Sequence, residues 1–242
     1  ASGNVVIDGI TWGFDINENN EAVNLYAPWD ITTSTIPSPT EVTYKNVTYP
    51  VVSVGKTNVS NESSLFFGSL EPNTTVSFAQ KDGKTSITKI NAYAFCGCTN
   101  IQSVNIPDSV TEIGDYAFYN CESLTTVNGV ENIETLGNYV FKDSKSLKYI
   151  TLDKTTTFGT GLFVGCNSLY LTITNPNMDL SNQNFVPAKL ICFKNSTTND
   201  YYTEKCKNSS YWGILDGTTK TDGTTYPKSF KVMVKTDTDV TV

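Results

Sequence analysis

The chain holds few of the residue types on which enzymes depend. Its 242 residues include no His, and all 17 basic residues are Lys, so Arg is absent as well. A Ser-His-Asp or Cys-His catalytic set therefore cannot be assembled within the chain. Zinc sites that use His are excluded, and so is recognition of phosphate or guanine by the bidentate fork of Arg.

Carboxylates remain as candidates for acid–base chemistry or metal binding. Nothing in the sequence places two of them across a cleft as a glycosidase requires, because those of the middle region lie mostly at predicted turns. Asp15, Asn17 and Asn19 have the D-x-N-x-N spacing of a calcium loop, but Asn20 stands where that loop needs Gly and Tyr26 where it needs Glu. We therefore predict a hairpin turn there, and no catalytic residue, metal site or cofactor.

The charge balance narrows the classes of partner. The net charge is −7 and the isoelectric point about 4.6, so we expect neither a nucleic-acid partner nor an anionic membrane surface. No segment approaches the ~20 apolar residues of a spanning helix, so we expect no membrane insertion within this chain. The abundance of Asn, Thr and Ser indicates a secreted or surface protein whose leader is not part of this chain.

The elements that position side chains follow from an internal repeat. Segments that begin at Ile90, Ile113, Leu136 and Phe158 align, with steps of 23, 23 and 22 residues. Matches in phase over four copies indicate a repeat architecture. Four columns are shared: an apolar column (Ile90, Ile113, Leu136, Phe158), a Phe column (Phe95, Phe118, Phe141, Phe163), a Cys or Ser column (Cys98, Cys121, Ser144, Cys166) and an Ile or Leu column (Ile101, Leu124, Leu147, Leu169).

Each copy contains two short extended segments and two turns, which together make one coil of a solenoid. Equivalent residues in successive coils then lie ~4.8 Å apart, the spacing of paired strands. An apolar column becomes a continuous stripe of core, and several coils must stack because none buries its apolar side alone. We expect Phe118→Ala to be strongly destabilising, and Ser144→Cys to be neutral or mildly stabilising.

The cysteines divide into groups on this pattern. Those of the Cys or Ser column face the core, where we expect buried thiols, since stacked Cβ atoms ~4.8 Å apart do not suit a disulfide that needs about 3.8 Å. Cys96 is expected nearer the surface. Cys192 and Cys206 both fall in the C-terminal element and are the best candidates for a disulfide, although two unbridged thiols remain the alternative.

The spacing of the shared columns within each repeat resembles that of the BspA-like leucine-rich repeat family of bacterial surface proteins. The motif I-G-x-x-A-F-x-x-C-x-x-L-x-x-V is clearest at residues 113–127, and the run 106–114 is equally typical. The resemblance covers roughly residues 5–215 and implies a closing element with a strand, a Tyr-bearing helical turn and a Trp that plugs the core. Ser144 in place of Cys, a degenerate coil at 54–78 and the tail 216–242 depart from the family pattern.

We therefore predict a mainly β fold, a leucine-rich-repeat solenoid with a cap at each end. Residues 1–53 should form an N-terminal β-hairpin cap, residues 54–176 the solenoid, and residues 177–242 a C-terminal capping element with a tail strand. The cap should contain two hairpins, with strands at 5–14 and 21–27 and at 41–45 and 47–54. The tail strand 229–242 is expected at an edge of the cap, and the start of a further domain is the alternative.

The outward residues of the second extended segment are the candidate binding residues. Side chains alternate along a strand, so the positions between the inward apolar ones must face solvent. They are Ser103, Thr126, Tyr149 and Tyr170, with Asn105, Asn128, Thr151 and Thr172 beside them. None is charged, which is typical of an adaptable binding surface, although β-propensity alone also favours Thr and Tyr there. Tyr149 and Tyr170 should be neighbours.

These observations favour a non-enzymatic, adhesin-like module at the cell surface or outside the cell, which binds an extracellular protein or glycan through the solenoid face. The family resemblance implies the same role, because the family is associated with adhesion and host-protein binding. Two alternatives stay open. One is a glycan-acting enzyme domain, which no nucleophile–base arrangement supports. The other is a structural spacer that presents another domain, which the tail strand would support.

Overall fold

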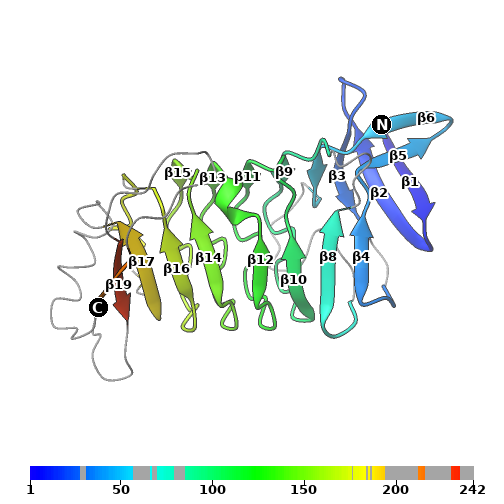
Figure 1. Cartoon of the computed structure of the whole chain (residues 1–242). Coiled ribbons are helices and arrows are strands. Elements are labelled where there is room, and N and C mark those ends of the chain that lie inside the picture. The colour runs from blue at the N-terminus through cyan, green and yellow to red at the C-terminus, as the bar shows by residue number, and fades with distance from the viewer. Residues whose placement is uncertain are drawn as a thin grey trace.

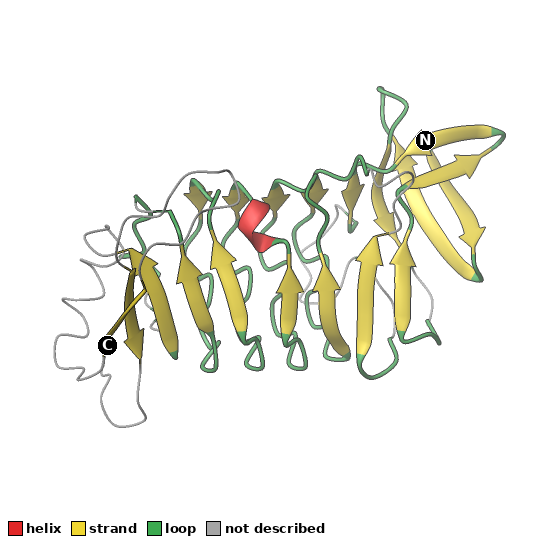
Figure 2. Ribbon diagram, viewed as in Figure 1, coloured by secondary structure: helices red, strands yellow, loops and turns green. Residues whose placement is uncertain are grey.

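The computed structural model is an elongated stack of coils, with the first strands at one end and β17 near the other (Figure 1). In the described part of the chain nearly all of the regular structure is β-strand, and one short 3-10 helix, η1 (Val130–Asn132), lies beside the larger sheet (Figure 2). The structure describes residues 1–27, 31–56, 66, 70–78, 85–175, 177–183, 185, 187–193, 212–215 and 230–234, the last two ranges by their backbone.

Nine strands form the larger sheet, which faces the viewer in Figure 1. From β4 to β17 neighbouring strands are parallel, and β19 is antiparallel to β17 and β18 on its two sides. In sheet order the strands are β18 (Trp212–Leu215), β19 (Phe230–Val234), β17 (Lys189–Phe193), β16 (Tyr170–Ile173), β14 (Tyr149–Leu152), β12 (Thr126–Asn128), β10 (Ile101–Asn105), β8 (Thr74–Phe78) and β4 (Thr35–Ser38).

Eight strands form the second sheet, on the other side of the core. The first three are antiparallel and the rest are parallel and only two residues long. In sheet order they are β1 (Ser2–Ile7), β2 (Ile10–Ile16), β3 (Ala22–Tyr26), β7 (Ser53–Val54), β9 (Lys89–Ile90), β11 (Glu112–Ile113), β13 (Thr135–Leu136) and β15 (Thr157–Phe158). A separate hairpin consists of β5 (Glu41–Tyr44) and β6 (Val47–Pro50).

The strand register confirms the repeat. Ile113 pairs with Ile90 on one side and with Leu136 on the other, and Leu136 pairs with Phe158. Each member of the apolar column thus lies beside its equivalent in the next coil, as stacking of one coil per repeat requires. The fold is the predicted one: a mainly β solenoid of leucine-rich-repeat type.

The Phe column is the centre of the core. Its four rings are at most 1% exposed and lie nearly parallel. Ring centroids are 4.8 Å apart between Phe95 and Phe118, 5.3 Å between Phe118 and Phe141, and 5.6 Å between Phe141 and Phe163. Stacking at these distances adds to the stability from area burial.

The column is longer than the four copies found in the sequence. Phe66 is fully buried with its ring centroid 5.3 Å from that of Phe95, and Phe185 lies 6.0 Å from Phe163. Phe185 follows Phe163 by the expected 22 residues. Phe66 precedes Phe95 by 29 residues, because an insertion breaks the period there, so the repeat pattern alone does not identify it.

Three members of the Cys or Ser column, Cys121, Ser144 and Cys166, are buried hydrogen-bond donors. Cys121 Sγ donates to Phe95 O at 3.0 Å, Ser144 Oγ to Phe118 O at 2.6 Å, and Cys166 Sγ to Phe141 O at 2.9 Å. Burial raises the pKa of Cys121, and it raises that of Cys166 to about 12, so both thiols keep the proton that they donate. The column is thus confirmed as buried thiols, and the shared role of donor explains why Ser replaces Cys in one copy.

Two substitutions at Ser144 separate this role from simple packing. Ser144 also accepts a hydrogen bond from Cys121 N at 3.2 Å, so Ser144→Ala leaves two buried backbone groups without a partner. We expect the free energy of unfolding, measured by denaturant titration, to fall by about 1–3 kcal/mol. Ser144→Cys keeps a donor and should stay close to wild type. An alanine variant as stable as wild type would show that these bonds contribute nothing.

The expectation for Cys96 was wrong. It is fully buried, whereas Tyr119, Lys142 and Val164, at the same position of later coils, are half-buried. Side-chain length alone does not account for this burial, because Val164 is no longer than Cys96 and is half-buried. Cys192 is also buried and takes part in no disulfide in this structure, so the candidate disulfide with Cys206, a residue outside the described part of the chain, is not supported.

Both predicted N-terminal hairpins are present, but the single strand expected at 47–54 is wrong, because β6 ends at Pro50 and β7 belongs to the eight-stranded sheet. β2 and β3 pair on either side of the turn at 17–21, and Tyr44 of β5 pairs with Val47 of β6. Lys45 and Asn46 between them have φ of 51° and 64°, as a type I′ turn requires.

The single strand expected at 5–14 is wrong. Asp8 and Gly9, with φ of 50° and 79°, turn the chain back, so this stretch forms the hairpin of β1 and β2. Asp-Gly is a favoured pair for a two-residue hairpin turn, and the signal was present in the sequence.

The C-terminal end is described in part. The predicted strand of the closing element is β17, and the tail strand is β19, which lies inside the sheet between β17 and β18 rather than at its edge. The helical turn implied by the family resemblance falls outside the described residues.

At the last coil the side chain of Gln183 is buried, with 1% of its surface exposed. Its Oε1 accepts a hydrogen bond from Leu162 N at 2.9 Å, and its Nε2 donates one to Gly159 O at 2.8 Å.

Candidate functional site

The eight candidate residues lie together on the outer surface of the nine-stranded sheet, as the strand alternation predicted. Register places Ser103, Thr126, Tyr149 and Tyr170 side by side in one row. In a second row Asn105 pairs with Asn128, and Thr151 pairs with Thr172. We call these eight residues the polar face.

Burial alternates along each strand as the fold requires. Between the two rows lie Val104, Val127, Ile150 and Leu171, which are at most 5% exposed and pack into the core. In the polar face the Asn side chains and both Tyr side chains are exposed, and the Ser and Thr side chains are half-buried. The strands are thus anchored by their inner residues and present the outer ones on a rigid support.

Tyr149 and Tyr170 dominate the polar face. They are 63% and 42% exposed, the most exposed aromatic side chains in the described part of the chain. Their ring centroids are 5.5 Å apart with an interplanar angle of 80°, a favourable edge-to-face contact. The neighbouring strands therefore hold the two rings as one aromatic projection.

Short polar side chains of the face bond to one another across strands. Asn128 Nδ2 donates to Asn105 Oδ1 at 2.7 Å, and Ser103 Oγ donates to Thr75 Oγ1 at 3.0 Å. Each of these groups retains further hydrogen-bonding capacity, because an amide or hydroxyl can make more than one bond. The eight residues of the polar face are thus uncharged, held by bonds across strands and able to bond a partner.

The rows extend further than the sequence indicated. Thr75 of β8 and Thr35 of β4 continue the first row beyond Ser103, and Ser77 and Pro37 continue the second. Sequence analysis missed them because β4 and β8 lie outside the four regular copies. At the other end the backbone of Lys189 in β17 follows Tyr170 in register.

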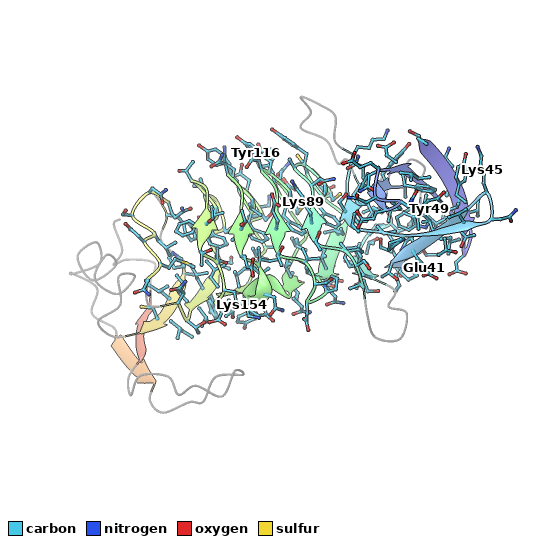
Figure 3. All side chains as sticks on the ribbon, turned by 90° about the horizontal axis from the view of Figure 1, so that it is seen from above. Glu41, Lys45, Tyr49, Lys89, Tyr116 and Lys154 are labelled. Atoms are coloured by element: carbon cyan, nitrogen blue, oxygen red, sulfur yellow. The ribbon has the colours of Figure 1, made fainter. Side chains whose placement is uncertain are left out.

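A second aromatic group, which sequence analysis also missed, lies away from the polar face. Tyr93, Tyr116 and Tyr139 stack with centroids 5.2 Å apart at both steps. Lys142 Nζ lies 5.7 Å from the ring of Tyr119 and 5.4 Å from that of Tyr139. Figure 3 places Tyr116 on one side of the ribbon and Lys154, which follows β14, on the other.

This stack differs from the Tyr pair in what it presents. The rings cover one another's faces, and all three tyrosines are half-buried. Their backbones have φ between 54° and 63°, which bulky residues rarely adopt. The repeated turn therefore holds these side chains in the stack as part of the coil structure.

The perturbed ionisable groups lie away from the polar face. Hydrogen bonds from Ser2 and Asn24 lower the pKa of Asp15 in the N-terminal hairpins, and bonds from Ser181 lower that of Asp179. In the turn with calcium-loop spacing, Asn17 Oδ1 accepts from the backbone N–H groups of Asn19 and Glu21, so its oxygen serves the hairpin. Within the described residues no cluster of three potential metal ligands exists.

Where the structure describes the chain, no helix has the length and apolar character needed to cross a membrane.

Comparison with known proteins identifies the repeat. Residues 73–191 match the model of the BspA-type leucine-rich repeat region, in six copies. No curated protein shows a significant match.

Solved structures share the fold. A leucine-rich repeat protein of T. pallidum is 21% identical, with a TM-score of 0.50 over 74% of this chain and 78% of that one. A leucine-rich repeat protein from Bacteroides ovatus ATCC 8483 is 25% identical, with a TM-score of 0.53; the match covers 72% of this chain but 48% of that protein. The stacked register, the Phe column and the family match agree: residues 73–191 of this chain are a leucine-rich repeat region of the BspA type.

Proposed function

We propose that the chain is a non-enzymatic interaction module of a secreted or cell-surface protein, and that it binds an extracellular protein through the polar face. The observation that supports this most strongly is the Tyr149–Tyr170 pair, which projects from neighbouring strands at one end of a row of uncharged polar side chains. Tyr is enriched at the centres of protein interfaces, where it contributes much of the binding energy. Solenoid sheets present such groups over an extended surface.

The charge of the polar face and of the whole chain favours a protein partner over a nucleic acid or an anionic membrane. None of the eight residues of the polar face is charged, and the chain as a whole carries −7 without any Arg, which is unfavourable for a nucleic acid or an anionic membrane. Adhesion at the cell surface is also what the BspA-type repeat implies.

A comparative binding screen tests the proposal. The chain and its Tyr149→Ser/Tyr170→Ser variant are immobilised and exposed to extracellular-matrix proteins, serum proteins and a glycan array. We expect at least one protein to be retained by the wild-type chain and to be depleted on the variant. Retention of glycans alone would replace the protein partner by a glycan, and hydrolysis of an arrayed glycan would contradict a non-enzymatic role.

A further inference from the structure

We propose that β1 is a self-association edge, through which two copies of this chain join their eight-stranded sheets in an antiparallel pair. β1 pairs with β2 alone and forms the outermost strand of its sheet. It lies at the extreme end of the molecule, far from the polar face of the central coils (Figure 1). This inference is independent of the function proposed for that face.

The outer edge of β1 carries unpaired backbone groups. Ala1 and Ile16 exchange both bonds of a ladder pair, Ile16 N to Ala1 O at 2.6 Å and Ala1 N to Ile16 O at 3.4 Å. Because bonded and non-bonded pairs alternate in an antiparallel ladder, the odd-numbered residues of β1 face β2. The N–H and C=O groups of Ser2, Asn4 and Val6 therefore point away from it.

β1 lacks the devices by which proteins protect such edges. Natural edge strands are shortened, charged, interrupted by Pro or covered, but β1 has six residues and includes neither a charge nor Pro. Tyr44 of β5 packs beside Gly3, but β5 pairs with β6 and not with the outer edge of β1. Its Val6 is 68% exposed, the highest value among large apolar side chains of the described residues.

The other edges whose side chains are described are protected. β4 carries Pro37, and the hairpin of β5 and β6 has four-residue strands with Glu41 and Pro50 at their ends. Figure 3 shows the side chains of this hairpin, with Glu41, Lys45 and Tyr49 labelled. β15 is two residues long, and the buried side chain of Gln183 bonds to Gly159 just beyond it. The contrast singles out β1.

The sequence of β1 suits a second copy of itself. In an antiparallel pair about a two-fold axis at Asn4, that residue lies opposite its own equivalent, Gly3 lies opposite Val5, and Ser2 lies opposite Val6. No like charges meet, although the chain carries −7 overall. The two facing amides can bond as those of Asn105 and Asn128 do within the chain. The contact is self-complementary, as a closed two-fold dimer requires.

Such a dimer would carry two polar faces on one particle. A partner that is repetitive or dense on a surface would then be bound at two points, and the second binding event would be intramolecular. The dimer thus offers avidity without any additional contact to the partner.

Sedimentation analysis of the whole 242-residue chain over a concentration series tests the edge. We expect a concentration-dependent dimer in the wild type. Asn4→Pro removes an N–H that points away from β2, and two-fold symmetry doubles the loss, so the dimer Kd should rise about tenfold or more. Asn4→Ser keeps the N–H and is the matched control. Circular dichroism and melting establish that each variant is folded.

A charge-swap experiment tests the register and does not depend on the Pro variant. Asn4→Lys and Asn4→Asp each place like charges opposite one another in the homodimer, so each alone should be monomeric where wild type is dimeric. An equimolar mixture of the two should recover a dimer. Val47→Lys is the control for a surface charge elsewhere: Val47 lies in β6 and is exposed as Val6 is, and this variant should leave the dimer unchanged. A wild type that stays monomeric at its solubility limit, or a dimer that all Asn4 variants retain, would overturn the proposal.

Discussion

Truncation of Phe118 to Ala should lower the free energy of unfolding by about 3–5 kcal/mol, the range for loss of a buried aromatic ring from a core. Phe118 is fully buried and stacks on Phe95 at 4.8 Å and on Phe141 at 5.3 Å. The variant removes one ring from the middle of the column, and intact coils on both sides limit how far the structure can collapse into the cavity.

Denaturant titration and thermal melting measure the effect, which we expect as a fall in Tm of roughly 10 °C for a chain of this size. Phe118→Leu is the matched control, since it keeps an apolar group in the column and should cost less than half as much. An unchanged Tm in the Ala variant would show that the register of coils described here is wrong.

Gly114→Ala should cost about 3 kcal/mol, the upper end of the usual range for overpacking. A Cβ at Gly114 would overlap Ala92 N and would lie 2.9 Å from Ala92 Cα in the preceding coil. These are backbone atoms, so the strain can be relieved only by moving the coils apart. The Gly of the I-G-x-x-A-F motif is thus required by the close approach of successive coils.

The control for this prediction is Gly9→Asn in the turn of the first hairpin. A Cβ there meets nothing within 4 Å, and φ is +79°, a region that Asn tolerates better than other residues. We expect little change in the unfolding midpoint for Gly9→Asn and a large fall for Gly114→Ala. Equal midpoints in the two variants would contradict the account of coil spacing.

The central coils were predictable because each repeat adds one residue to every column. Phe118, Leu136 and the outward Tyr149 were assigned from period and strand alternation alone, and the structure confirms their burial or exposure. At the degenerate end the same reasoning failed. Phe66 belongs to the core, and Thr75 extends the first row beyond the polar face. The inserted residues between regular copies break the period that would have aligned both of them.

Other features depend on contacts that a residue type does not specify. Cys121 and Ser144 share a column because both donate to a carbonyl of the preceding coil, and composition alone indicated only small buried side chains. The stack of Tyr93, Tyr116 and Tyr139 arises from a left-handed turn conformation, which the sequence does not signal for Tyr. The open edge of β1 depends on the turn at Asp8 and Gly9, which makes β1 and β2 two strands rather than one.

The most direct test of the proposed function compares two double variants against the partner that the screen identifies. Tyr149→Ser/Tyr170→Ser removes the aromatic pair of the polar face, and both side chains are exposed, so folding should be nearly intact. Tyr119→Ser/Lys142→Ser alters the other aromatic surface. By surface plasmon resonance we expect the first variant to lose at least about tenfold in affinity, since interface Tyr residues often contribute 2 kcal/mol or more. The second should bind as wild type does. Unchanged affinity in the first variant with loss in the second would place the binding site on the opposite side of the solenoid.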